Sequence, residues 1–273
     1  MTAQLEKAER FKALHQRPGA FVIPNPWDAG SAWLLARLGF EALATTSAGF
    51  ANSIGKPDGA VTREETLDNV RAIVAATSLP VAADLEKGFG DDPEACAETI
   101  RLGAKAGLVG GSIEDATGRA DDPIYPFDAA VERVKAAVKA ARSLPFPFVL
   151  TARAENLLHG RQDLEDTIRR LQAFAEAGAD VLFAPGLRTR EQIDAVVRAV
   201  APKPVNVLIN AAASFPLDEL AGLGVKRVSV GSAFARVAYG AFLHAAREVH
   251  DKGIFSFVRE TIPFAEFNAM FKR

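Results

Sequence analysis

The chain has 273 residues, of which 49% are hydrophobic and 24% are charged, a composition typical of globular proteins with a large buried core. Its net charge of −2 comes without a long basic block, which argues against nucleic-acid binding, and its single cysteine excludes both an intrachain disulfide framework and a multi-cysteine metal site. Residues 1–7 form no apolar leader and no run approaches the roughly 18 apolar residues of a membrane span, so we expect a cytoplasmic protein without membrane contact.

In chain order, short apolar runs alternate with alanine-rich amphipathic segments. The runs have the continuous aliphatic character of buried parallel strands, and they lie at 21–25, 42–47, 81–86, 108–115, 148–155, 181–187, 205–210 and 227–232. The segments between them are predicted to be helical, among them 62–77, 92–106, 128–141, 163–177 and 189–200. Capping boxes support two of these helices, because Thr62 stands three residues before Glu65 and Thr189 three before Gln192.

Eight strands that alternate with helices predict an α/β fold, a (β/α)₈ barrel that takes up residues 1–273 as one domain. A doubly wound sheet is the alternative, although no G-x-G-x-x-G follows the first run. Residues 233–273 form a C-terminal helical arm, which ends in a segment rich in phenylalanine. We consider two interpretations of its tail, residues 254–273: one more helix on the barrel wall, or a segment that packs on a partner subunit, since exposed aromatic surface is a liability on a monomer.

The active site of such a barrel lies at the carboxyl ends of its strands. Asp84 and Glu86 are two residues apart on the third strand, which places them on the same side, and Glu114 ends the next strand. Carboxylates that face one another repel unless a cation lies among them, and an all-oxygen set favours Mg²⁺ or Mn²⁺ over zinc. The alternative is that these acids pair with Lys87, Arg153 and helix N-termini.

Arg153 ends the fifth strand, across from these acids. Its guanidinium can bind a substrate carboxylate or phosphonate through two parallel hydrogen bonds, or it can pair with Glu155 or Glu114. The small residues at 45–49 allow backbone N–H groups to approach a ligand oxygen. Asn206, on the seventh strand, is among the residues expected to contact the far end of the substrate.

Taken together, these segments resemble the isocitrate lyase/phosphoenolpyruvate mutase superfamily, and within it the carboxyvinyl-carboxyphosphonate phosphorylmutase/oxaloacetate decarboxylase-like branch. The matching motifs run in order over roughly residues 20 to 235. They are NPWDAGSA at 25–32, GF at 39–40, ATTSAG at 44–49, GKPD at 55–58, ADLEKGFG at 83–90, SIED at 112–115, ARAE at 152–155 and AGAD at 177–180. Each motif alone is common, but the ordered set is specific.

The resemblance implies a modified barrel whose eighth helix is swapped between subunits, in a homodimer or homotetramer. It implies Mg²⁺ held directly by Asp84, with Glu86 and Glu114 acting mainly through water, and a catalytic Asp58 that orients water or metal-bound groups. The substrate would be a 2-oxo acid that reacts through an enolate. The substrate-binding residues implied are Trp27, Thr46, Ser47, Ala48, Arg153 and Asn206.

The segment 116–126, which corresponds to the lid of the family, departs from its pattern. It has no cysteine or histidine of the lyase lid and no lysine or asparagine of the mutase lid, and Cys96 lies in a helical segment elsewhere. Tyr125 and His159 could carry protons, although lid packing and a loop position explain them as well. We therefore expect a lyase or decarboxylase for a small 2-oxo or 2-hydroxy dicarboxylate. A phosphonopyruvate hydrolase or mutase and a non-catalytic 2-oxo-acid-binding protein are the alternatives.

Overall fold

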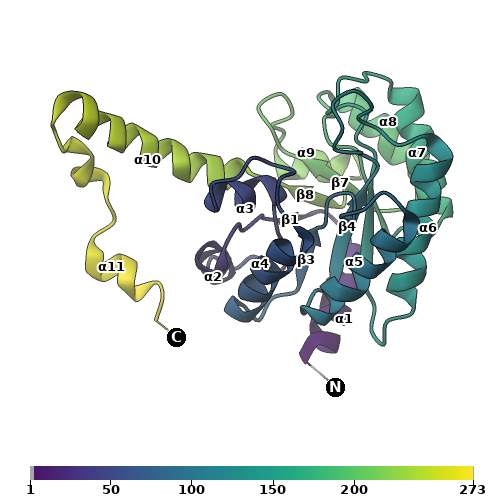
Figure 1. Cartoon of the computed structure of the whole chain (residues 1–273), viewed down its shortest axis with the longest axis horizontal. Helices are drawn as coiled ribbons and strands as arrows, with labels where there is room; N and C mark the ends of the chain where they lie inside the picture. Colours follow the sequence, from purple (N-terminus) through teal and green to yellow (C-terminus); the bar gives the residue numbers. More distant parts are fainter. Residues whose placement is uncertain (1–2, 273) are drawn as a thin grey trace.

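Eight parallel strands form a barrel in the computed structural model, which describes residues 3–272 (Figure 1). The strands are β1 (Phe21–Ile23), β2 (Leu43–Ala44), β3 (Val81–Asp84), β4 (Gly110–Glu114), β5 (Val149–Arg153), β6 (Val181–Phe183), β7 (Val205–Leu208) and β8 (Arg227–Ser229). They pair in the order β1-β8-β7-β6-β5-β4-β3-β2. The Ala44 N–H donates to the Pro24 carbonyl at 3.1 Å and links β2 back towards β1, so the predicted barrel is confirmed in a nearly closed form.

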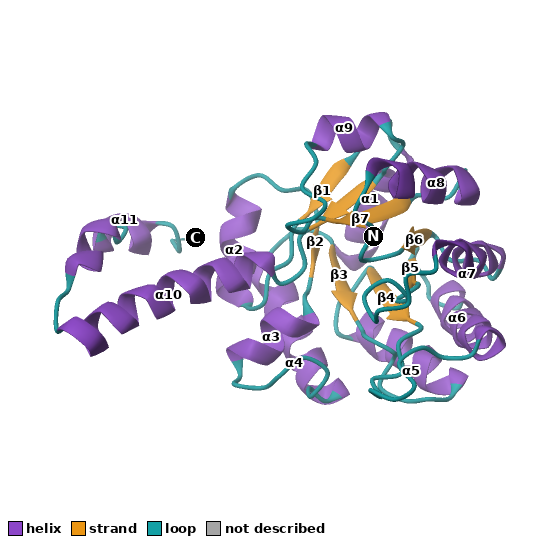
Figure 2. Ribbon diagram, turned by 90° about the horizontal axis from the view of Figure 1, so that it is seen from above, coloured by secondary structure: helices purple, strands orange, loops and turns teal. Residues whose placement is uncertain are grey.

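Helices lie around the outside of this barrel (Figure 2). They are α2 (Ala29–Arg37), α3 (Ser47–Ser53), α4 (Arg63–Ala76), α5 (Pro93–Lys105), α6 (Phe127–Arg142), α7 (Leu164–Glu176), α8 (Arg190–Val200) and α9 (Leu217–Gly222). Both predicted capping boxes are confirmed at the starts of α4 and α8, where Thr62 and Thr189 accept from the backbone N–H three residues on. Their apolar faces pack on the sheet, because the buried side chains of these helices and strands form two continuous clusters.

A further helix, α1 (Ala3–Gln16), packs on the amino-terminal end of the barrel. Its Phe11 is fully buried, and a Cβ on Gly110 of β4 would come within 2.7 Å of the Phe11 ring. Glycine at this position therefore allows the helix to approach the strand. Buried apolar residues of α1 and of the lower strand positions thus close the bottom of the barrel and leave its polar residues near the opposite end.

Most predicted apolar runs are longer than the observed strands, and the run 42–47 differs most in kind, because β2 ends at Ala44 and α3 begins at Ser47. The Thr46 side chain accepts a hydrogen bond from the Gly49 N–H at 3.3 Å, which makes it the N-cap of a helix. The hydroxyl-rich segment at this strand end is therefore a helix start rather than an open loop.

The C-terminal arm extends away from the barrel (Figure 1). It consists of α10 (Ala233–Lys252), the 3₁₀ segment η1 (Ser256–Glu260) and α11 (Phe264–Ala269). The end of the arm returns to α2, where the Trp33 Nε1–H donates to the Met270 carbonyl at 2.6 Å. Most of the arm is exposed, and Phe264 is 85% exposed. The arm is thus not a further helix on the wall of its own barrel, while its exchange between subunits stays a prediction.

Within the described part of the chain, no helix has both the length and the apolar composition that a membrane crossing needs.

Candidate active site

Charged side chains gather at the carboxyl ends of β3, β4 and β5. Glu114 and Arg153 are partners in the β4–β5 register, and Asp84 lies opposite Ser112 in the β3–β4 register. Parallel pairing thus brings together residues that are far apart in the sequence. Glu155 follows β5 by two residues and turns its carboxylate back to Arg153. The predicted convergence of acids and an arginine is therefore present at this end of the barrel.

Arg153 is the cation of this cluster. Its Nη1 lies 2.8 Å from Asp84 Oδ1, its Nη2 3.1 Å from Glu114 Oε2, and its Nε 2.8 Å from Glu155 Oε1. The guanidinium is further placed 5.3 Å from the centre of the Phe183 ring. The pairing of Arg153 with Glu155 and Glu114 that we considered as an alternative is thus confirmed, and binding of a substrate carboxylate by Arg153 stays a prediction.

Asp84 accepts hydrogen bonds on both of its carboxylate oxygens. Oδ1 accepts hydrogen bonds from Arg153 Nη1 and from the Glu86 N–H, and Oδ2 accepts one from the Ser47 hydroxyl at 3.0 Å. Burial raises the pKa of Asp84, but the Arg153 charge and hydrogen bonds from Glu86 and Ser47, including the Ser47 N–H, outweigh burial and lower it below its ordinary value. The ionised form of Asp84 is therefore favoured.

The other acids around Asp84 show raised pKa values. Burial and the negative charges of Asp84 and Asp58 raise the pKa of Glu86 to about 7, and Glu86 is held at φ 48°. Burial, followed by the charge of Asp84, also raises the pKa of Asp58, and burial raises that of Glu114 well above its ordinary value. One arginine therefore does not neutralise this group of acids, and a second cation would lower their repulsion.

The donor set fits Mg²⁺ or Mn²⁺ held mainly by water. Within residues 3–272, no three acid, histidine or cysteine side chains are arranged as direct metal ligands. A catalytic zinc site needs about three such protein ligands, whereas magnesium keeps several waters and binds through one or two carboxylates. Asp84 could serve as the one direct carboxylate ligand of such a magnesium ion. Glu86 and Glu114 lie close enough to interact electrostatically with Asp84 and could hold the waters of the ion.

A cavity of about 100 Å³ opens from the cluster into the barrel. Asp84 and Arg153 line it near the cluster, and Asn206 and Arg227 line it as well. Its other polar lining residues are Asn25, Thr45, Thr46, Ser112, Thr151 and Ser229. Sequence reasoning missed Arg227, although a charged residue at the start of an apolar strand is a visible signal.

The predicted substrate-binding residues do not all face this cavity. Thr46 and Asn206 line it, but Trp27, Ser47 and Ala48 do not. The Ser47 hydroxyl and N–H bind Asp84, so Ser47 positions that acid. The Asn206 side chain donates to the Ser229 hydroxyl and accepts from Arg227, so its hydrogen bonds are made inside the barrel. Contact between these residues and a substrate stays a prediction.

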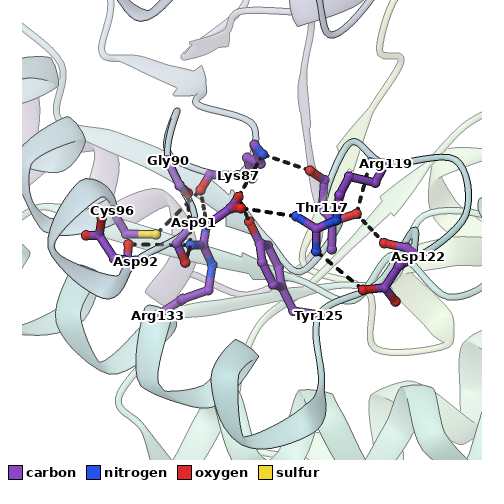
Figure 3. Close-up of polar contacts among 10 residues, drawn as sticks. All are labelled: Lys87, Gly90, Asp91, Asp92, Cys96, Thr117, Arg119, Asp122, Tyr125 and Arg133. Carbon is purple, nitrogen blue, oxygen red and sulfur yellow. Dashed lines mark hydrogen bonds and ion pairs between the residues drawn. The ribbon is translucent and has the colours of Figure 1, made fainter.

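The lid at 116–126 is joined to the loop after β3 by a polar network (Figure 3). Asp91 accepts from the Tyr125 hydroxyl at 2.5 Å and pairs with Lys87 at 2.9 Å and Arg119 at 3.1 Å. The buried Arg133 of α6 stacks on the Tyr125 ring at 4.2 Å. Its Nη atoms donate to backbone carbonyls of the loop, which are those of Lys87, Gly90, Asp91 and Asp92.

Tyr125, Cys96 and His159 have different positions relative to the site. Tyr125 packs in the lid, and burial together with its bond to Asp91 raises its pKa above the ordinary value. Cys96 is fully buried in α5, and burial raises its thiol pKa to about 11, so it is inert. His159 is on the loop after β5, where partial burial and the charges of Arg153 and Arg161 lower its pKa.

Comparison with known proteins gives one consistent family. The model of the family phosphoenolpyruvate phosphomutase matches residues 11–250. A crystal structure from Burkholderia cenocepacia, provisionally described as a lyase/mutase, is 61% identical, with a TM-score of 0.96 over 99% of this chain and 97% of the other.

Two relatives with named activities extend this likeness. The oxaloacetate decarboxylase of Paraburkholderia xenovorans is 32% identical over 89% of this chain and 79% of its own length. A structure of oxaloacetate acetylhydrolase in complex with oxalate is 27% identical, with a TM-score of 0.87 over 97% of this chain and 94% of the other.

Proposed function

Because the chain belongs to the phosphoenolpyruvate mutase/isocitrate lyase superfamily, we propose that it is a divalent-metal-dependent carbon–carbon lyase or decarboxylase for a small 2-oxo or 2-hydroxy dicarboxylate. The observation that carries this proposal is the group of acids around Asp84, whose raised pKa values indicate that Arg153 alone does not offset their burial and mutual repulsion. Such a group suits a hard cation and a ligand that chelates it. Two relatives, an oxaloacetate decarboxylase and an oxaloacetate acetylhydrolase, support the substrate class.

The residues have separate roles in this proposal. Asp84 would hold Mg²⁺ directly, with Glu86 and Glu114 holding its waters. A bound cation would polarise the 2-oxo group and stabilise the negative charge that develops on its oxygen. Arg153 has five N–H donors, of which three face carboxylates, so N–H groups of its two Nη atoms can still bind a substrate carboxylate. Asp58 has a raised pKa and can hold a proton at its carboxyl group beside Ser47.

The lid favours carbon–carbon over carbon–phosphorus chemistry. A phosphonate group carries additional negative charge, and the basic residue of the lid is Arg119. Arg119 is paired with Asp91 at 3.1 Å and with Asp122 at 3.3 Å, so its charge is already balanced. The lid also lacks a cysteine that could protonate the product of isocitrate or methylisocitrate cleavage, and Cys96 is buried in α5 with its Sγ 3.5 Å from the Lys87 carbonyl.

We also propose that the protein is a homodimer or homotetramer in which residues 233–273 pack on a neighbouring barrel. Support comes from the exposed apolar side chains along the arm, which include Val237, Phe242, Phe255, Phe264 and Phe267. Each phenylalanine is worth on the order of 1.5–3 kcal/mol when buried. A second copy of this chain could cover this surface.

A substrate panel tests the proposed activity. Purified protein is incubated with Mg²⁺ or EDTA and with oxaloacetate, methylisocitrate, a dimethylmalate or phosphonopyruvate, and pyruvate, oxalate and phosphate are followed. We expect Mg²⁺-dependent turnover of a dicarboxylate and negligible methylisocitrate cleavage. Asp84→Ala should lose this activity, while Asp128→Ala, which removes an exposed acid of α6, should keep it.

Other results of the substrate panel would favour the alternative functions. Phosphate release from phosphonopyruvate would favour the carbon–phosphorus enzyme. Binding of 2-oxo acids without turnover of any of them would favour the binding protein. Dicarboxylate turnover that is equally fast in EDTA would refute the metal-dependent mechanism.

A further inference from the structure

Arg227 is a buried arginine inside the barrel, at the first residue of β8. Its side chain is 6% exposed within this chain and lines the cavity that Asp84 and Arg153 also line. Its Nε donates to Asn206 Oδ1 at 2.8 Å and its Nη2 to the Thr151 hydroxyl at 2.9 Å. Its Nη1 lies 3.5 Å from His15 Nε2, a long contact. The guanidinium is therefore held in place by neutral groups.

No carboxylate of residues 3–272 forms an ion pair with Arg227, which sets it apart from Arg153 and Arg170. Arg133 is also buried without a carboxylate partner, but it donates to four backbone carbonyls. Arg153 has three carboxylate partners, and Arg170 pairs with Asp115 and Asp166. Burial lowers the pKa of Arg227 to about 9, so it is still a cation at neutral pH. An unpaired charge in a protein interior is strongly unfavourable, so a counter-ion is expected.

The neighbouring His15 does not supply a negative charge. Burial and the charge of Arg227 lower the pKa of His15 to about 3, so the imidazole is neutral at neutral pH. His15 also contacts Phe11 and Phe21 edge to face, and its Nδ1 lies 2.8 Å from the Phe11 carbonyl. The side of Arg227 that faces α1 is therefore closed by neutral and aromatic groups.

The opposite side of Arg227 faces the cavity. Small residues of the lining, Ala44, Ala82 and Gly111, leave its interior open, and hydroxyl and amide groups of Ser112, Thr151, Asn206 and Ser229 line the rest. The volume of about 100 Å³ is well above what one water molecule needs. Arg227 uses Nε–H on Asn206, one Nη2–H on Thr151 and one Nη1–H towards His15, so one N–H on each Nη atom is left for a further acceptor. A carboxylate, with two acceptor oxygens, suits such a pair of donors.

We propose that Arg227 forms an anion-binding subsite in the barrel interior, which takes a carboxylate-sized anion. The anion has two possible sources with the same chemistry. One is the second carboxylate of the dicarboxylate substrate, a source that rests on the proposed function. The other is a free small anion such as formate or bicarbonate, which would bind whether or not the protein is a lyase.

Anion-dependent stability tests the subsite. The Tm of the full chain is measured against sodium formate, with ionic strength balanced by a bulky sulfonate. By mass action, formate at about one hundred times its Kd should raise the Tm of the wild type by about 5–10 °C. Arg227→Met should lose this rise. Lys226→Met is the matched control, because it removes the cation next in sequence, whose Nζ lies outside the barrel and donates to the Gly19 carbonyl at 2.6 Å.

Ligand affinities distinguish the two sources. In the presence of Mg²⁺, malate, a 2-hydroxy dicarboxylate, is compared with lactate, its monocarboxylate counterpart. If the substrate supplies the anion, Arg227→Met should lower malate affinity at least tenfold and leave lactate affinity within about twofold, and formate should compete with malate. If a free anion fills the subsite, formate should stabilise the wild type without competing with either acid.

The proposal is overturned if the wild type shows no formate response beyond that of a sulfonate control, or if Arg227→Met responds as the wild type does. Should Arg227→Met fail to fold, Arg227→Lys is the second variant, because it keeps the positive charge on a shorter side chain. Formate should then still raise its Tm, but with a weaker affinity than in the wild type. A formate response lost in Arg227→Met without turnover of any acid in the panel would retain the subsite and reject the proposed function. Turnover of an acid without any formate response would retain the proposed function and reject the subsite.

Discussion

Arg153 pairs with three carboxylates within a small volume, so the cost of its removal can be calculated. Arg153→Met keeps an unbranched apolar stem, lacks the guanidinium, and so removes the contacts of 2.8, 3.1 and 2.8 Å to Asp84, Glu114 and Glu155. Removing one partner of a buried ion pair costs about 3–5 kcal/mol. Since 1 kcal/mol shifts the Tm of a chain of this size by about 2–4 °C, we expect the Tm to fall by about 6–20 °C.

Magnesium distinguishes a cation site from a purely structural ion pair. If Mg²⁺ binds among these acids, it supplies the positive charge that Arg153→Met has lost, and it should raise the Tm of the variant more than that of the wild type. Arg170→Met is the control, because Arg170 is 5% exposed and pairs with Asp115 at 3.1 Å and Asp166 at 2.7 Å. Mg²⁺ should not raise the Tm of Arg170→Met more than it raises the Tm of the wild type.

The conservative variant Arg153→Lys tests the substrate role of the same side chain. An ammonium group lacks the planar fork of arginine, and the loss of one charge-assisted hydrogen bond of roughly 1.5–3 kcal/mol predicts a kcat/KM about 10- to 150-fold lower. The reasoning is refuted if Mg²⁺ shifts the Tm of Arg153→Met and Arg170→Met equally. Loss of stability in Arg153→Lys with unchanged activity per folded molecule would reject the substrate role.

Three further predictions concern other parts of the chain. A thiol-blocking reagent should leave activity intact, because Cys96 is fully buried with its pKa raised to about 11; rapid inactivation of folded protein would contradict this. Deletion of residues 254–273 should lower the oligomeric state or cause aggregation in light scattering, and a folded full-length monomer at micromolar concentration would disprove the proposed assembly. Because the pKa of His15 is about 3 in the folded chain against 6.5 unfolded, stability present above pH 6.5 is lost as the pH falls towards 3. In urea unfolding, the wild type should therefore lose about 2 kcal/mol relative to His15→Gln between pH 7 and pH 5, and equal pH dependence would refute it.

The barrel could be predicted because its strands are buried on both faces and separated by amphipathic helices with capping boxes. The boundary after β2 could not, because Thr46 fits either a strand end or an N-cap, and its hydrogen bond to the Gly49 N–H decides between them. The position of α1 at the bottom of the barrel depends on the fit of Phe11 against Gly110, which is a tertiary contact.

The acids of the site could be predicted because strand ends meet at one edge of a parallel barrel. Their partners could not, because Arg153 has three acids within reach and the strand register decides which nitrogen faces which carboxylate. The same holds for Asn206, whose hydrogen bond to Arg227 across the β7–β8 pair was not predicted, while its contact with a substrate stays a prediction. Side-chain direction inside the barrel is set by register, which the sequence alone does not reveal.

Calorimetric titration of Mg²⁺ into the wild type and Asp84→Ala tests the metal site most directly. The account predicts that the wild type binds Mg²⁺ and that Asp84→Ala does not bind it measurably, because the direct ligand is lost. Glu86→Gln and Glu114→Gln should retain weaker binding, since these residues act through water. Unchanged Mg²⁺ affinity in Asp84→Ala would contradict the assignment of this cluster as the metal site.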